Sequence, residues 1–205
     1  MDNTTGMGAH KAEVCAGLSP IGRRLFKYIE FDEDEQLIAE VRKDPIGLFF
    51  IIVIGAFITL AIVLATSFFA IGISRFSIDF GESSSMIRSV IVVVGLLLAF
   101  FSVIMTLIST ILYRSNVVFI TDQKIAEVVY ISILNRRTLQ LNIGNVEDVS
   151  VVQKGLLPRI FKYGSLIIET AGEMKNPAFT YVPEPYEVAQ LIIQAHEEYV
   201  KKYGN

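Results

Sequence analysis

Two long uncharged stretches decide the fold of this chain: PIGLFFIIVIGAFITLAIVLATSFFAIGIS (residues 45–74) and SVIVVVGLLLAFFSVIMTLISTILY (residues 89–113). A helix rises about 1.5 Å per residue and the hydrocarbon core of a bilayer is about 30 Å thick, so about 20 apolar residues suffice to cross it. Both stretches exceed that length, and they hold most of the apolar excess of a chain that is 52% hydrophobic. The sequence therefore predicts two transmembrane helices joined as a hairpin.

The charges beside these stretches predict how the hairpin is oriented, because lysine and arginine near the end of a span resist translocation. The segment between the spans has only Arg75 and Arg88, which Asp79 and Glu82 offset. We therefore expect residues 75–88 outside the cell and both termini in the cytoplasm. The cations that favour this orientation lie before the first span (Arg23, Arg24, Lys27, Arg42 and Lys43) and after the second (Arg114, Lys124, Arg136 and Arg137).

The interior of the spans argues against one class of function. Neither span contains Asp, Glu, Lys, Arg or His. Intramembrane ionisable groups mark most ion and proton pathways, so a transporter or pump acting by itself is not expected. Small residues recur at the four-residue spacing that lets helices approach closely: Gly55 with Thr59, Ala61 with Ala65, and Gly95 with Ala99. We expect these residues to pack the two spans on each other, and a dimer face is the alternative.

Composition sets further limits. The net charge of −3 and the pI near 5.5 give no basic balance that would indicate nucleic-acid binding. The single cysteine, Cys15, cannot form an internal disulfide, which agrees with a reducing cytoplasm. The first 44 residues contain no early apolar core, so a cleaved signal peptide does not explain the first span.

Residues 114–205 change to short β-branched stretches separated by turn residues, a pattern typical of a small all-β sheet or barrel. In the clearest strand Leu139, Leu141 and Ile143 alternate with polar residues, which places one face of the strand in a core. We expect six strands, at residues 116–121, 124–131, 137–143, 146–153, 165–170 and 178–182.

A helix is predicted after these strands. It opens at residues 183–185, because the prolines of Pro-Glu-Pro are tolerated in a first helical turn and break what precedes them. Its apolar residues share one stripe at helical spacing, and this stripe should cap the open end of the sheet: Val188, Leu191, Ile192, Ala195 and Tyr199.

The segment before the first span is less regular. Residues 1–20 lack periodicity and predict a mobile tail, followed by a cytoplasmic pre-membrane segment at residues 21–44. The apolar residues at 37, 38 and 41 fit either a short strand or an amphipathic segment leading into the span. The acidic run at residues 32–35 lacks the spaced oxygen ligands and the glycine of a calcium loop, so we expect the solvated start of a helix or strand there.

Three motifs, in this order along the chain, resemble the bacterial pleckstrin-homology-like domains attached to two membrane helices: VVFITDQKI (117–125), IGNVEDV (143–149) and GLLPRIFKYG (155–164). The acidic residues 30–35 and the Lys-Asp-Pro at residues 43–45 resemble the segment that precedes the first span in that family. The resemblance implies a membrane α-helical hairpin plus an α+β, mostly β domain, a PH-like split β-barrel capped by its C-terminal helix. It also implies a bacterial cell membrane and no reaction. Eukaryotic relatives bind phosphoinositides around the first strand pair, but the matching turn here supplies only Lys124.

The loop at residues 154–162 is the candidate functional surface, because apolar residues between cations suit contact with anionic headgroups. Its residues are Lys154, Leu156, Leu157, Arg159, Ile160, Phe161 and Lys162. Large apolar residues in the loops of small barrels more commonly pack, so plugging of the barrel end by the leucines and phenylalanine is the alternative. Arg136 and Arg137 either join this surface or are ordinary solvated charges of a hairpin.

Together these patterns predict a non-enzymatic, membrane-anchored interaction module, with no cofactor, no metal and no catalytic residues. The sequence contains no Gly-rich phosphate loop, no nucleophile elbow and no His or Cys spacing of a zinc site. The expected partners are the lipid bilayer and either a protein partner or a second copy of the chain. The alternative is an accessory subunit of a transporter or envelope-assembly complex that acts mainly through its transmembrane helices.

Overall fold

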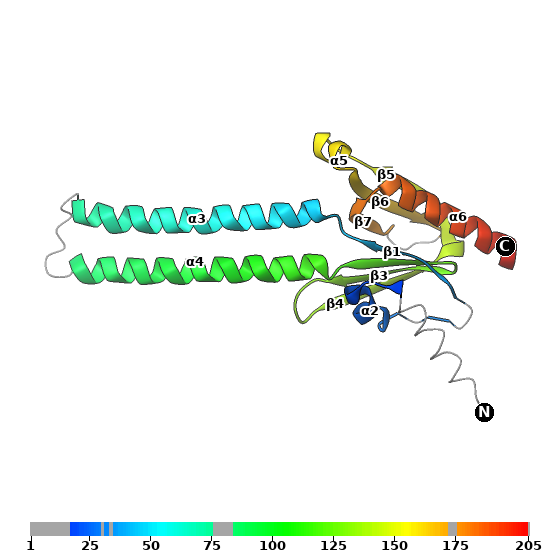
Figure 1. The fold of residues 1–205 in the computed structure, drawn as a ribbon, viewed down its shortest axis with the longest axis horizontal. Helices are drawn as coiled ribbons and strands as arrows, with labels where there is room; N and C mark the ends of the chain where they lie inside the picture. The colour runs from blue at the N-terminus through cyan, green and yellow to red at the C-terminus, as the bar shows by residue number, and fades with distance from the viewer. Residues whose placement is uncertain (1–16, 30, 33–34, 76–83, 172–175, 205) are drawn as a thin grey trace, which may run out of the picture. The chain divides into compact units, whose positions relative to one another are not determined.

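The computed structural model describes residues 17–29, 31–32, 35–75, 84–171 and 176–204. Most of the predicted tail and residues 76–83 of the predicted external loop lie outside these residues. Figure 1 labels most of the helices and strands. Their bounds are α2 (Pro20–Phe26), β1 (Leu37–Arg42), α3 (Pro45–Arg75), α4 (Ser84–Arg114), β2 (Val117–Thr121), β3 (Lys124–Tyr130), β4 (Arg136–Asn142), the 3-10 helix η2 (Ile143–Asn145), β5 (Val146–Val152), α5 (Leu156–Ile160), β6 (Tyr163–Thr170), β7 (Ala178–Pro183) and α6 (Pro185–Tyr203).

The chain divides into two compact units: residues 48–111 form one, and residues 1–47 with 112–205 form the other. The first unit contains most of α3 and α4, which run antiparallel. Both helices are long and apolar enough to cross a membrane, with mean hydropathies of 3.1 and 2.9.

The two helices of this unit pack through glycines that face threonines. A Cβ on Gly55 would overlap the side chain of Thr106, and a Cβ on Gly95 would overlap that of Thr66. Between these contacts the hydroxyls of Thr59 and Ser102 lie 3.0 Å apart. Missing side chains let the backbones approach, so Gly55 and Gly95 serve the packing of the two helices on each other. The other predicted small pair, Ala61 with Ala65, is exposed.

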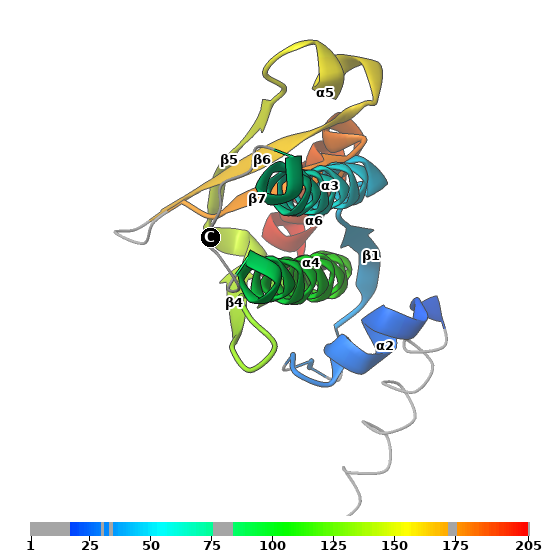
Figure 2. The same cartoon turned by 90° about the vertical axis from the view of Figure 1, so that its left-hand side faces the viewer.

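The second unit contains two antiparallel sheets (Figure 2). The first sheet has the strand order β1-β2-β3-β4 and the second has the order β5-β6-β7. The sheets are joined at η2, where the amide of Gly144 donates to the side chain of Asn142. All six predicted strands are present, and residues 37–42 form the seventh, which resolves the choice between a strand and an amphipathic segment in favour of β1.

The main core lies between the inner faces of the two sheets and α6, which contacts β5, β6 and η2. Ile120 and Ile125 come from the first sheet, Leu166 and Ile168 from the second, and all four are 0 to 1% exposed. The predicted stripe of α6 is confirmed, because Val188, Ile192 and Ala195 are buried in this core and Tyr199 packs against it. The expected PH-like architecture of sheets and a C-terminal helix is therefore present, as an open pair of sheets.

A second core, which the sequence did not predict, covers the other face of the first sheet. Phe26 of α2 is fully buried against Phe119 of β2, with ring centroids 5.5 Å apart. Leu18 is 3% exposed, so the packed segment begins inside the range predicted as a tail. Ser19 caps α2 by accepting from the amide of Gly22, and its own amide donates to Glu40 of β1 at 2.8 Å. The first sheet is thus buried on both faces.

The expectation that the acidic run at residues 32–35 is solvated is wrong for Glu35, which is 0% exposed. Its carboxylate lies 2.9 Å from the ammonium of Lys124 and accepts from the hydroxyl of Thr121 and the amide of Asp32. Burial by itself lowers the pKa of Lys124, but the hydrogen bond and charge of Glu35 and the charge of Asp32 raise it above its ordinary value of 10.5. This network fastens the chain before β1 onto the turn between β2 and β3.

Replacing Lys124 by Met tests that network. We expect Lys124→Met to lower the free energy of unfolding by about 3 kcal/mol, because a buried carboxylate then loses its cation. Since the pKa of Lys124 is raised in the folded state, the contribution of this lysine is present below pH 10.5 and is lost as the pH rises through the raised value. The measurement is chemical unfolding in detergent at pH 8 and above pH 11.

The matched control is Lys201→Met, since the Lys201 side chain is 76% exposed and 3.9 Å from Glu197. It should leave the stability unchanged within about 0.5 kcal/mol. The double substitution Glu35→Gln, Lys124→Met should recover part of the loss. Equal stability of Lys124→Met and the parent protein would contradict a structural role for the pair.

The helix contact predicts a second effect. Gly55→Ala should separate α3 from α4, because its new methyl group overlaps Thr106, whereas Gly72→Ala should not, because nothing lies within 4 Å of its Cβ. The readout is disulfide formation in a protein with Cys15→Ser, Thr59→Cys and Ser102→Cys. We expect a high yield in this background and with Gly72→Ala, and a several-fold lower yield with Gly55→Ala. An unchanged yield would show that the helices do not pack through Gly55.

Candidate functional site

The predicted surface loop connects β5 to β6 and contains the short helix α5. Gly155 lies at the N-cap of α5 with φ of 98° and ψ of −177°, a backbone conformation that residues other than glycine rarely adopt. The side-chain amide of Gln153 then donates to the carbonyls of Pro158 and Tyr163, at 3.3 and 2.8 Å. These bonds close the loop at its base. Figure 2 shows α5 beyond one end of β5 and β6.

The apolar residues of this loop are exposed, so the expectation that they plug the end of the barrel is wrong. Leu156 is 75% exposed, Leu157 44%, Ile160 68% and Phe161 50%. The physical reason is that residues of α6 already fill the main core, which leaves no space for them. No residue of α5 is buried. The loop therefore carries its leucines, isoleucine and phenylalanine on the surface of the domain.

The cations of the loop differ in their surroundings. Among the described residues, Lys154 and Arg159 form no ion pair, and both are exposed. Lys162 is 3.6 Å from the carboxylate of Glu184. The carbonyl of Lys162 also accepts from the amide of Glu184, and both residues have positive φ, 53° and 44°. Lys154 and Arg159 are therefore available to an anion, whereas Lys162 helps to fix the loop on the start of α6.

Three tyrosines connect the base of this loop to the ends of the apolar helices. The rings of Tyr163 and Tyr181 stack with centroids 5.6 Å apart, and Tyr181 meets Tyr113 edge to face at 5.9 Å. Tyr113 donates its hydroxyl to the carbonyl of Asp44, and the amide of Asp44 donates to the carbonyl of Tyr181, both at 2.6 Å. Tyr181 has φ of 57°. Since Asp44 precedes Pro45 of α3, the loop base lies where both helices join this unit.

A half-buried charge pair accompanies the tyrosines. Burial lowers the pKa of Lys43, which the charge of Glu127 partly offsets. Burial also raises the pKa of Glu127, against the charges of Lys43 and Arg137. The ammonium of Lys43 further lies 5.7 Å from the ring of Tyr113. Lys43 is thus partly buried within the domain, whereas Lys154 and Arg159 of the loop are exposed.

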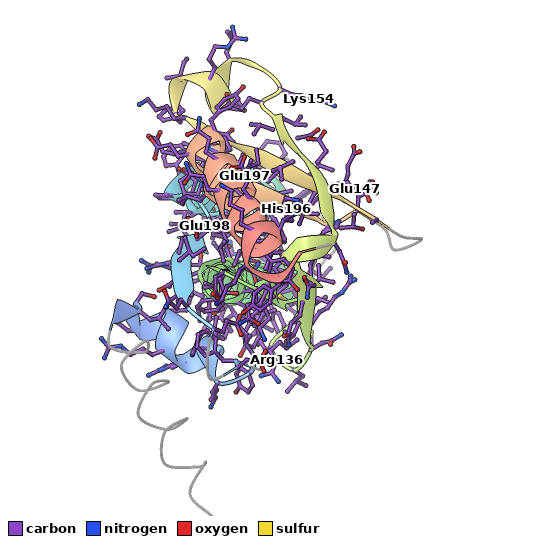
Figure 3. The ribbon with its side chains drawn as sticks, turned by 90° about the vertical axis from the view of Figure 1, so that its right-hand side faces the viewer. Arg136, Glu147, Lys154, His196, Glu197 and Glu198 are labelled. Atoms are coloured by element: carbon purple, nitrogen blue, oxygen red, sulfur yellow. The ribbon has the colours of Figure 1, made fainter. Side chains whose placement is uncertain are left out.

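Arg136 and Arg137 do not join the loop at residues 154–162. They begin β4, and Figure 3 shows Arg136 and Lys154 on opposite sides of the domain. The guanidinium of Arg136 stacks on the ring of Tyr28 at 3.4 Å, which ties the β3–β4 hairpin to the segment after α2. Arg137 is exposed. The structure therefore divides the predicted surface residues into two groups.

Sequence reasoning missed the apolar residues between β3 and β4. Ile131, Ile133 and Leu134 are 60%, 64% and 98% exposed. The signal in the sequence is that three large apolar residues stand in a hairpin turn, where polar residues are usual. Extending the strand prediction to Ile131 concealed it.

The described residues show no arrangement that suits a metal. Nowhere among them do three His, Cys, Asp or Glu side chains come together. His196 lies with its Nδ1 2.8 Å from the carbonyl of Ile143, so its ring connects α6 to η2. The chemistry that the site offers is contact of exposed cations and apolar side chains with a surface.

Comparison with known proteins agrees with this architecture. The family model described as bacterial PH domain matches residues 37–196, from β1 to α6 and across both apolar helices. Neither curated proteins nor solved structures gave a match. Since the matched region covers more than half of the chain, this protein belongs to the bacterial PH domain family.

Proposed function

We propose that this protein is a non-enzymatic interaction module, anchored by α3 and α4 at the cytoplasmic face of a bacterial membrane, whose loop at residues 154–162 lies on anionic lipid headgroups. Membership of the bacterial PH domain family supports an interaction module. The observation that carries the rest is that the apolar residues of the loop are exposed together with Lys154 and Arg159, which form no ion pair with any described residue.

The outer surfaces of α3 and α4 support the membrane anchor. Large apolar side chains along both helices are exposed, such as Leu60 at 53%, Phe68 at 69% and Leu97 at 58%. In water such a surface is strongly unfavourable, since each square ångström of exposed apolar area costs about 25 cal/mol. In the core helix of a soluble protein these side chains would be buried. Lipid chains are the environment that suits them.

Anchoring changes what a weak surface contact can do. Each cation near an anionic leaflet contributes about 1 kcal/mol, which is too little to hold a soluble domain on a membrane. A domain already tethered to the bilayer pays the association cost once, so contacts of Lys154 and Arg159 suffice to orient it. The module would then present the rest of its surface to partners at the membrane in a fixed direction.

The membrane topology can be tested with cysteine labelling, since Cys15 is the only cysteine to remove. In a Cys15→Ser background, Ser85→Cys should react with a membrane-impermeant maleimide added to intact spheroplasts. Lys202→Cys should react only after the membrane is permeabilised, because positively charged flanks remain in the cytoplasm. Labelling of Lys202→Cys in intact spheroplasts would refute the cytoplasmic location of the domain. Recovery of the protein in the soluble fraction without detergent would refute the membrane anchor.

The loop can be tested by fluorescence because the chain contains no tryptophan. The full-length Leu156→Trp protein is reconstituted into vesicles with about 30% anionic lipid, so that both leaflets are charged. We expect brominated lipid in these vesicles to quench the fluorescence of this tryptophan. Quenching should weaken with salt, because the contact is electrostatic. It should also weaken several-fold when Lys154→Gln and Arg159→Gln are added.

The matched control for these charge removals is Lys201→Gln, on the last turn of α6, which should leave the quenching unchanged. Vesicles of zwitterionic lipid alone should give weak quenching with every variant. Equal quenching in anionic and zwitterionic vesicles would refute the role of the loop cations.

A further inference from the structure

The turn between β3 and β4, residues 131–135, is closed by hydrogen bonds and exposes large apolar side chains. The amide of Ile131 donates to the carbonyl of Asn135 at 2.9 Å, and the amide of Asn135 donates to the hydroxyl of Ser132 at 3.0 Å. At the base of the hairpin the amide of Tyr130 donates to the side chain of Asn116. Single exposed apolar residues are ordinary, but here Ile131, Ile133 and Leu134 are held together on one braced turn.

The strand register places this turn at a particular end of the first sheet. Val117 of β2 pairs with both Arg42 of β1 and Val128 of β3. Arg42 is three residues before Pro45, where α3 begins, and Val117 is three residues after Arg114, where α4 ends. Since β3 continues past Val128 toward the turn, residues 131–135 project from the same end of the sheet at which the chain enters and leaves the two apolar helices.

The charges beside the turn favour an anionic surface. Residues 131–137, ISILNRR, contain two arginines and no carboxylate. Arg136 is held over the ring of Tyr28, so its role is to brace the hairpin. Arg137 is exposed beside it. An apolar tip followed by a cation at its base matches the order of layers that a bilayer presents, with acyl chains beneath and phosphates above.

We propose that residues 131–135 form a second lipid-contact site, in which Ile133 and Leu134 insert into the interfacial layer of the bilayer and Arg137 meets anionic phosphates. This inference rests on the proposed function, because the bilayer concerned is the one that α3 and α4 span. With α5 on one side of the domain and this tip on the other, two contacts fix the tilt of the domain on the membrane.

The test uses Leu134→Trp in full-length protein in vesicles, again with brominated lipid. Leu134 is 98% exposed, so the substitution has nothing in the domain to disturb. We expect a blue-shifted emission and quenching several-fold greater than that of Tyr203→Trp, which lies on the last turn of α6. Adding Ile133→Asp to Leu134→Trp should reduce the quenching several-fold, and adding Arg137→Gln should reduce it in anionic vesicles only.

The outcomes separate this inference from the proposed function. Quenching of Leu156→Trp without quenching of Leu134→Trp would overturn the tip contact and leave the loop contact standing. Equal quenching of Leu134→Trp and Tyr203→Trp would overturn it as well. Unchanged quenching after Ile133→Asp would show that the tip does not insert. Quenching of Leu134→Trp in a protein whose Leu156→Trp is not quenched would support the tip and refute the loop.

Discussion

The pairing of β1 with β2 is the constraint on which the second unit depends. The chain leaves β1, passes through both apolar helices and returns to β2, yet Arg42 and Val117 are neighbours in one sheet. The hydrogen bond from Tyr113 to the carbonyl of Asp44 closes this connection across 69 residues of sequence. Because backbone groups in a sheet must be paired, the pairing of β1 with β2 holds the start of α3 close to the end of α4. Both helices therefore connect to the same end of the first sheet.

Conformational strain is concentrated at that same end. Among the described residues, the non-glycine residues with positive φ are Lys162, Tyr181 and Glu184. A backbone hydrogen bond joins Glu184 to Lys162, and Tyr181 stacks on Tyr163 and accepts a hydrogen bond from the amide of Asp44. Such conformations cost about 1 to 3 kcal/mol each and persist only where the surroundings determine them. Here two cores, one on each face of the first sheet, provide the rigidity that supports exposed and strained loops.

Burial decides what each charged residue does. Glu35 and Lys124 form an ion pair inside the domain. Lys43 and Glu127 are half-buried and each is influenced by the charge of the other, so these four charges have their partners within the folded domain. Lys154 and Arg159 remain exposed, at a site where apolar residues are exposed too. Large apolar residues exposed to water on two loops carry a cost in hydration free energy, which contact with a lipid surface would remove.

The sequence by itself determined the two apolar helices, the six later strands and the stripe of α6, because periodicity and charge report local structure directly. Three motifs in order along the chain also indicated the bacterial PH domain family, whose family model matches residues 37–196. Only the tertiary structure decided that residues 37–42 are a strand, that Phe26 makes a second core and that Glu35 is buried, since each depends on a partner distant in the chain. The exposure of α5 and the separation of Arg136 from Lys154 likewise follow from which space α6 fills and from strand register, neither of which is written in a local pattern.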